Sequence, residues 1–146
     1  MKRIVGLTIF LAIAMLATSV PAQAQDLDVT MYRLANAWRR NDSKAISGLI
    51  ARDGVSIETD AGRFGPVGAR SAAAILRTLF GERQTTDVRT RQFQGVGGSP
   101  QKGYAELIWT TRAPETTEAL RIVVFVEFVQ ELDREWRITR IRLLQP

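Results

Sequence analysis

The residue types that could do chemistry in this chain are limited to carboxylates, Tyr, Ser, Thr, Lys and Arg, because its 146 residues include no His and no Cys. Without these two types the sequence has no Ser-His-Asp triad, no Cys-His pair, no thiolate zinc site and no disulfide. The sequence therefore predicts neither a metal site nor a cofactor, and any proton transfer would fall to one of the remaining types, a carboxylate above all.

Three short motifs have simpler structural explanations than a functional one. The loop Gly95-Val96-Gly97-Gly98 has Pro100 where a dinucleotide-binding loop needs its third glycine. Asn41-Asp42-Ser43 fits a glycosylation sequon, but it also fits a helix break followed by an N-cap. Arg89 and Arg91 alternate along a predicted strand, where an ion-paired outer face is favoured over a site for an anionic ligand.

The first residues have the order of a secretory signal peptide. Met1-Lys2-Arg3 is cationic, residues 4–20 carry no charge, and Pro21 precedes Ala22-Gln23-Ala24, an A-x-A cleavage pattern. A retained membrane anchor is the alternative, but this uncharged run is at the short edge of what spans a bilayer. We predict that residues 1–24 are cleaved after Ala24, that the protein is secreted or periplasmic, and that the mature form has no stable membrane anchor.

Residues 25–146 are predicted to form a single domain. They carry 18 basic and 15 acidic residues, a net charge of +3. This charge is weak evidence for a nucleic-acid partner, so none is expected. A chain of this length buries enough surface to form a hydrophobic core without disulfides.

Apolar residues at helical spacing predict three helices, each with one apolar stripe. Strand-like alternation predicts six strands, with no repeat and no linker between the elements. The predicted helices are capped or ended by Asp26 or Asp28 in the first, Asp42 or Ser43 in the second, and Gly81 in the third, which spans residues 69–80. The predicted strands are residues 55–59, 63–67, 88–94, 104–111, 120–130 and 136–144.

The element order α-α-β-β-α-β-β-β-β predicts an α+β fold. Three helices with one apolar stripe each can all pack on the same face of a sheet. The sheet is expected to be antiparallel, strongly curved and cone-shaped, with the helices on its concave side.

Two stretches resemble the nuclear transport factor 2-like superfamily, which includes SnoaL and ketosteroid isomerase. Residues 34–59, LANAWRRNDSKAISGLIARDGVSIET, have the superfamily's opening run of helix, polar turn, short helix and strand. Residues 136–141, WRITRI, resemble its final strand. The resemblance extends over nearly all of residues 26–146, and the chain looks most like small exported bacterial members without an assigned activity.

The resemblance implies where catalytic groups would lie if the protein were an isomerase of this superfamily. Such enzymes use a carboxylate near the end of the first strand as a proton shuttle, with a Tyr and a protonated Asp as an oxyanion hole. The carboxylate position corresponds to Glu58, with Asp60 just beyond, and Glu127 stands near the Asp position. The Tyr position corresponds to Leu34, so one of the three groups is missing.

Strand alternation favours structural roles for these carboxylates. Val55 and Ile57 take the inward face of their strand, which leaves Glu58 as an exposed strand-end residue. Glu127 falls on the outer face of its strand, where it can pair with Arg140 or Arg142.

The same alternation suggests a ligand pocket and an interface. A small apolar ligand could occupy the cone between the helices and the sheet, near Trp38, Phe80, Leu107 and Ile122, although such residues are more often core. Val123, Phe125 and Val129 make the outer face of their strand more apolar than a solvated face should be. In this superfamily sheet faces commonly pack together in dimers, so these three residues are predicted to form a homodimer face.

The sequence thus predicts an exported, non-enzymatic domain that binds a small ligand or acts as a scaffold. The alternative is a proton-shuttling isomerase, dehydratase or hydrolase of the same fold, with Glu58 or Asp60 as the base. That alternative requires a water-excluding cleft that raises the pKa of an inward carboxylate. Binding of anionic polymers through strand arginines is a third hypothesis, which predicts affinity that falls steeply with salt.

Overall fold

The computed structural model describes residues 22–145, and the elements in this part of the chain follow the predicted α+β order, which confirms the fold class. Residues 1–21, most of the predicted signal peptide, lie outside the described residues. Among the described residues no helix combines the length and the apolar character needed to cross a membrane. The elements are α1 (Ala22–Arg39), α2 (Ser43–Ser47), β1 (Val55–Thr59), β2 (Gly62–Val67), α3 (Ala69–Glu82), β3 (Gln84–Gly97), β4 (Lys102–Arg112), β5 (Leu120–Gln130) and β6 (Trp136–Leu144).

The strands form one curved sheet in the order β2-β1-β6-β5-β4-β3. Four of its five neighbouring pairs are antiparallel, but β1 and β6 are parallel, with Ile57 opposite Ile141. The sheet is therefore mixed rather than wholly antiparallel as the sequence suggested. The parallel pair arises because the chain leaves β1 through β2 and α3 and returns to it only with the last strand.

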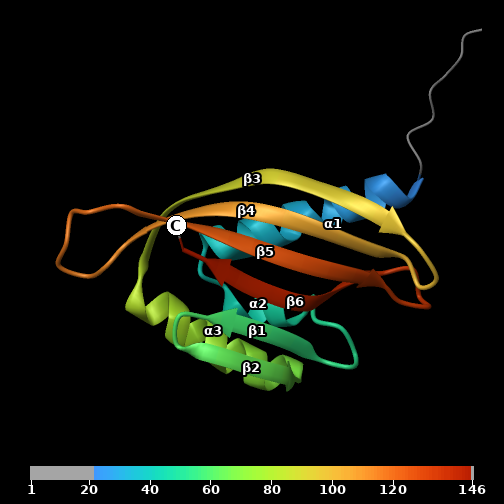
Figure 1. The fold of residues 1–146 in the computed structure, drawn as a ribbon, viewed down its shortest axis with the longest axis horizontal. Helices are drawn as coiled ribbons and strands as arrows, with labels where there is room; N and C mark the ends of the chain where they lie inside the picture. Colours follow the sequence, from blue (N-terminus) through green and yellow to red (C-terminus); the bar gives the residue numbers. More distant parts are fainter. Residues whose placement is uncertain (1–21, 146) are drawn as a thin grey trace, which may run out of the picture.

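The helices lie behind the sheet in Figure 1, with α1 behind β3 and β4 and α3 behind β1 and β2. This arrangement follows from alternation along the long strands, whose buried positions recur at every second residue on β4 and β5. Buried apolar side chains from the helices and the sheet form one hydrophobic core between them. Its members include Leu34, Trp38, Ile57, Leu76, Leu107, Trp109, Ile122, Val124, Phe128 and Ile138.

The ends of several elements differ from the sequence prediction: β2 begins at Gly62, β4 spans Lys102–Arg112, and α1, α3 and β3 differ more. Helix α1 begins at Ala22, so Asp26 and Asp28 lie within it and neither is its cap. Helix α3 continues through Gly81 to Glu82 and passes directly into β3. Strand β3 extends beyond residues 88–94 in both directions and stays paired with β4. Three bulges interrupt its alternation, which is the pattern that marks a strand in the sequence.

The break between α1 and α2 agrees with the prediction. Asn41 adopts a left-handed backbone with φ of 54°, which ends α1. Asp42 is the N-cap of α2, and its Oδ1 accepts a hydrogen bond from the Ala45 amide at 2.9 Å.

Candidate functional site

Glu58 lies on β1 between two arginines. Its Oε1 accepts a hydrogen bond from Arg63 Nη2 at 3.3 Å, and its Oε2 accepts one from Arg142 Nε at 3.2 Å. The hydrogen bonds from Arg63 and Arg142 hold the pKa of the Glu58 carboxyl below its ordinary value of 4.5. A carboxylate with a lowered pKa is a poorer proton acceptor, so this environment is the opposite of the one that a general base needs.

Asp60 lies in the turn between β1 and β2. Its Oδ2 accepts hydrogen bonds from Arg83 Nη2 at 2.9 Å and from Gln145 Nε2 at 3.4 Å. Asp60 also borders a hollow of about 330 Å³ between the β1–β2 hairpin and α3. Of the two predicted base candidates, only Asp60 borders a mostly apolar space.

The four predicted pocket residues lie in the packed core. Trp38, Leu107 and Ile122 are completely buried, and Phe80 is 8% exposed. Trp38 and Phe80 meet Trp109 edge to face, with ring centroids 5.3 to 5.8 Å apart. None of the four borders the hollow beside the β1–β2 hairpin or the hollows on the outer face of the sheet.

The predicted dimer residues Val123, Phe125 and Val129 are half-buried on the outer face of β5. Tyr104 and Ile108 of β4 extend this apolar surface, and the Tyr104 ring stacks on Phe125 with centroids 6.1 Å apart. No described helix lies on this side of the sheet (Figure 1). We call these five side chains the outer apolar patch.

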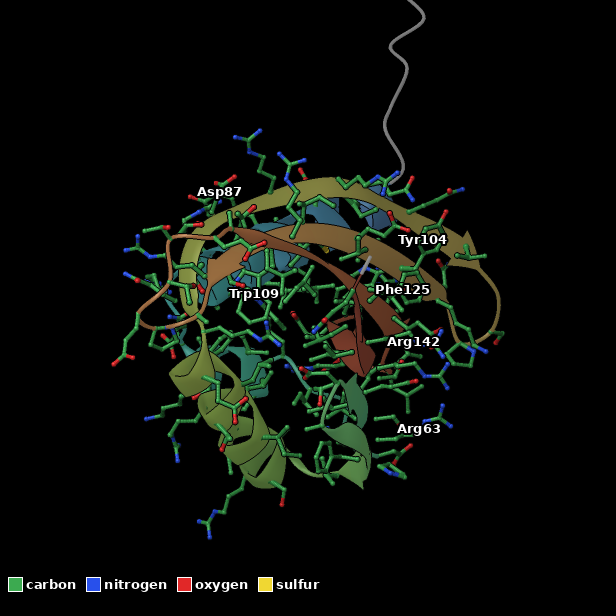
Figure 2. All side chains as sticks on the ribbon, turned by 60° about the vertical axis from the view of Figure 1, so that its left-hand side comes forward. Arg63, Asp87, Tyr104, Trp109, Phe125 and Arg142 are labelled. Atoms are coloured by element: carbon green, nitrogen blue, oxygen red, sulfur yellow. The ribbon has the colours of Figure 1, made fainter. Side chains whose placement is uncertain are left out.

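A row of charged residues crosses the outer face through this patch. The strand pairings place Arg63 opposite Glu58, Glu58 beside Arg142, Arg142 opposite Phe125, and Phe125 opposite Glu106. Figure 2 shows Phe125, Arg142 and Arg63 following one another down the side of the sheet away from Trp109, which points inward. Glu106 also pairs with Arg91 of β3 at 3.7 Å. We call the five side chains of Arg63, Glu58, Arg142, Phe125 and Glu106 the outer row.

The neighbouring row carries the other predicted ion pair. Glu127 accepts a hydrogen bond from Arg140 Nη1 at 3.5 Å, which confirms the predicted pairing of Glu127 with a strand arginine. Glu127 stands opposite Tyr104, so in this row, as in the outer row, a charged side chain lies beside an aromatic ring. Arg140 and Glu127 therefore have a structural partner each, as the alternation predicted.

Two hollows flank the outer apolar patch. One of about 290 Å³ is bordered by Ser56, Glu58, Arg63, Arg140 and Arg142. The other, of about 550 Å³, is bordered by residues of β4, β5 and β6 and by the loop before β1. The outer face is thus neither a flat solvated surface nor covered by the described chain.

Sequence reasoning identified three residues of the outer apolar patch and missed Tyr104 and Ile108 as members. Their alternation with buried Ala105, Leu107 and Trp109 was the available signal, because it places them on the outer face. What the sequence could not give was the register that stacks Tyr104 on Phe125. Within the described residues no group of acidic, His or Cys side chains is arranged to hold a metal ion.

No protein-family model and no curated protein matches this sequence. Several solved structures are similar to it. A DUF4783 family protein from Bacteroides uniformis is 14% identical with a TM-score of 0.65, over 79% of this chain and 95% of that one. A protein named Rd1NTF2 is 13% identical with a TM-score of 0.61, over 83% of this chain and 99% of that one.

An LEH-like epoxide hydrolase from Mycobacterium tuberculosis is also similar. It is 17% identical with a TM-score of 0.59, over 84% of this chain and 79% of that one. At these identities the likeness establishes the fold and leaves the activity open. The chain therefore has the nuclear transport factor 2-like fold, as its opening and closing stretches suggested.

Proposed function

We propose that this protein is a non-catalytic scaffold that forms a homodimer through the outer face of its sheet. The observation that carries the proposal is the outer apolar patch, which lies on a face that no described helix covers. Large apolar surfaces left open on soluble domains commonly mark sites of association. The patch lies on two strands inside the sheet, and charged side chains such as Glu106, Glu127 and Arg142 border it, which is the usual anatomy of an interface.

The outer row favours one arrangement of the two copies. In a face-to-face dimer with its two-fold axis parallel to β5, Phe125 meets its own copy and β6 of one protomer faces β4 of the other. Arg142 of each protomer would then lie over the partner's Glu106. A two-fold axis perpendicular to the strands would instead set Arg142 against Arg142. Opposite charges therefore select the first arrangement.

Two features support a role without catalysis. Glu58, the first base candidate, has its pKa lowered by Arg63 and Arg142, so it does not have the character of a general base. The cone in which a substrate would be enclosed is filled by Trp38, Phe80 and Trp109. The incomplete catalytic set noted in the sequence points the same way.

The mass of the protein in solution tests the proposal. We expect light scattering during size exclusion to give twice the chain mass for the wild type and the chain mass for Phe125→Asp, because a charged carboxylate would replace the apolar ring at the centre of the patch. Tyr32→Asp is the matched control, since Tyr32 is 72% exposed on α1, away from the sheet's outer face. A wild type that stays monomeric at high concentration contradicts the proposal.

We also propose that the protein is exported and acts as residues 25–146. The cationic start, the uncharged run and the A-x-A pattern support this. Cleavage after Ala24 leaves the buried Leu27 of α1 in the mature chain. Mass spectrometry of the protein recovered from the periplasm or medium should give a chain that begins at Gln25, and a full-length cytoplasmic product would contradict export.

The second candidate function is hydrolysis with Asp60 as the base. It is favoured by the hollow that Asp60 borders and by the fold shared with the LEH-like epoxide hydrolase. If it holds, Asp60→Asn should abolish turnover of a small epoxide such as styrene oxide, while Asp133→Asn should leave it unchanged. Turnover no faster than the rate without protein would remove this candidate.

A further inference from the structure

The hollow between the β1–β2 hairpin and α3 has the composition of a small-molecule site. Its walls include Phe64 from β2 and Ile75 and Leu79 from α3, and its polar groups include Asp60, Thr78 and Glu82. Its volume of about 330 Å³ lies at the lower end of the range for ligand pockets. Phe64 is 36% exposed, so this aromatic ring has surface left for a ligand to cover.

The charged groups that border this hollow, Asp60 and Glu82, are both negative. Both are carboxylates, and Arg83, which binds Asp60 at 2.9 Å, does not itself border the hollow. Glu82 is exposed and forms no ion pair with any described residue. The hollow therefore carries a net negative charge, although the whole chain has a net charge of +5.

The Asp60 carboxylate is also held in place. Arg83 and Gln145 both donate to its Oδ2, so the two donors fix the carboxylate while Oδ1 forms no hydrogen bond with a described residue. Arg83 is only 17% exposed, which limits the movement of the pair. A fixed carboxylate with a free oxygen beside apolar walls is suited to accept a hydrogen bond from a charged donor.

We propose that this hollow binds a small amphiphilic cation, with its apolar body against Phe64, Ile75 and Leu79 and its ammonium group between Asp60 and Glu82. Burial of the alkyl chain supplies the affinity, and the carboxylates supply the preference for a cation. The site lies at the hairpin and α3, apart from the outer apolar patch of β4 and β5. It is therefore independent of the proposed dimer.

Three probes of equal chain length test the proposal on the mature protein: n-hexylammonium, 1-hexanol and hexanoate. In two-dimensional amide NMR spectra we expect hexylammonium to shift the amides of Ala61, Thr78 and Glu82 in a saturable way. Hexanol should bind more weakly and hexanoate most weakly, because the carboxylates repel it. No saturable shift at about 10 mM hexylammonium, or equal affinity for hexylammonium and hexanol, would overturn the proposal.

Two variants separate the contributions of charge and shape. Glu82→Gln should weaken hexylammonium binding about twofold to fivefold and leave hexanol binding unchanged, since a partly exposed ion pair contributes modestly. Ala74→Phe should abolish binding of both probes, because Ala74 borders the hollow from an exposed helical position. Glu135→Gln, an exposed carboxylate in the turn before β6, is the control. Equal weakening by Glu82→Gln and Glu135→Gln would show that only the net charge matters and would overturn the site.

Discussion

At the scale of single residues, a chain of hydrogen bonds connects the core to the end of α1. The buried Trp109 donates from Nε1 to Thr85 Oγ1 at 2.9 Å, and Thr85 Oγ1 donates to Asn41 Oδ1 at 2.6 Å. Asn41 is the residue whose left-handed backbone ends α1. One hydroxyl therefore satisfies the polar atom of a completely buried side chain and also ties β3 to the turn before α2.

Thr85→Val should lower the free energy of unfolding by about 1–3 kcal/mol, because it removes the acceptor of the buried Trp109 indole N–H without a change in side-chain shape. Urea denaturation followed by Trp fluorescence measures the difference. Thr90→Val is the matched control on the same strand, since Thr90 is exposed and its hydroxyl makes no hydrogen bond with a described residue. If both variants lose the same stability, the hydrogen-bond chain does not contribute what we assign to it.

Glu58 predicts how the stability depends on pH. Its pKa in the folded protein is lowered from 4.5 by the hydrogen bonds from Arg63 and Arg142, so the folded state favours the ionised form. The resulting stabilisation is fully present above the unfolded-state pKa and is lost as the pH falls through the folded-state pKa. Glu58→Gln should thus be less stable than the wild type at neutral pH, and the difference should disappear in acid.

Urea unfolding between about pH 7 and pH 3 checks this difference, because linkage confines it to the window around and below the ordinary pKa. Glu118→Gln is the comparison variant, since Glu118 is exposed and forms no ion pair with a described residue. Its pH profile should follow that of the wild type. A Glu58→Gln profile that runs parallel to the wild type down to the acid limit would contradict the lowered pKa.

At the scale of elements, the β1–β2 hairpin has no room for a side chain at Gly65. Gly65 has φ of 131°, and a Cβ at this position would lie 2.7 Å from Ser56 Cα on the facing strand. Both the backbone conformation and the close approach exclude a side chain. The hairpin forms one wall of the hollow that borders Asp60, so this glycine also shapes a candidate site.

Gly65→Ala should lower the free energy of unfolding by about 1–3 kcal/mol, because a strained backbone and a backbone clash act together. Gly81→Ala is its control within the next element. Gly81 lies inside α3 with an ordinary helical backbone and open space at its Cβ position, so alanine there should raise stability by about 0.5–1 kcal/mol. Thermal unfolding of both variants gives the comparison, and changes of the same sign would contradict it.

The elements themselves could be predicted wherever one pattern dominated. Strands β5 and β6 were found at their observed bounds because their burial alternates almost without interruption. The ends of β3 were missed because its bulges disturb the alternation, and the start of α1 was missed because Asp26 is equally compatible with a cap and with a helix interior. Local patterns fix the type of an element better than its ends.

The candidate site was predictable only in part, for a different reason. Alternation gave the outer positions of Glu58, Phe125 and Glu127. It could not show that Arg142 also reaches Glu58, because that contact depends on the parallel pairing of β1 with β6, two strands separated by most of the chain. The hollow beside Asp60 was missed since it depends on how α3 packs against the hairpin tip.

At the scale of the whole molecule, the two faces of the sheet have different chemistry. The inner face carries completely buried apolar side chains such as Trp38 and Trp109. The outer face combines apolar side chains with ordered rows of opposite charge. Tests of the proposed dimer therefore concern the outer face.

The outer row predicts a result that a change within a single protomer cannot produce. If the two-fold axis runs parallel to β5, Glu106→Arg sets Arg against the partner's Arg142, and Arg142→Glu sets Glu against the partner's Glu106. Each single variant should weaken the dimer at least about tenfold, because like charges then face each other at an interface. The double variant restores opposite charges and should recover most of the affinity, as sedimentation velocity over a dilution series would measure.

Recovery in the double variant separates this contact from effects within one protomer. Arg142 and Glu106 lie on strands β6 and β4, with β5 between them, so their positions are about 10 Å apart in the same sheet. Arg142→Glu also creates a repulsion with Glu58 of its own chain, and Glu106→Arg is too far away to relieve it. Thermal unfolding of the dilute protein would measure the effect of that repulsion on the single protomer. Single variants that dimerise like the wild type, or a double variant no better than the singles, would exclude the arrangement with Phe125 on the two-fold axis.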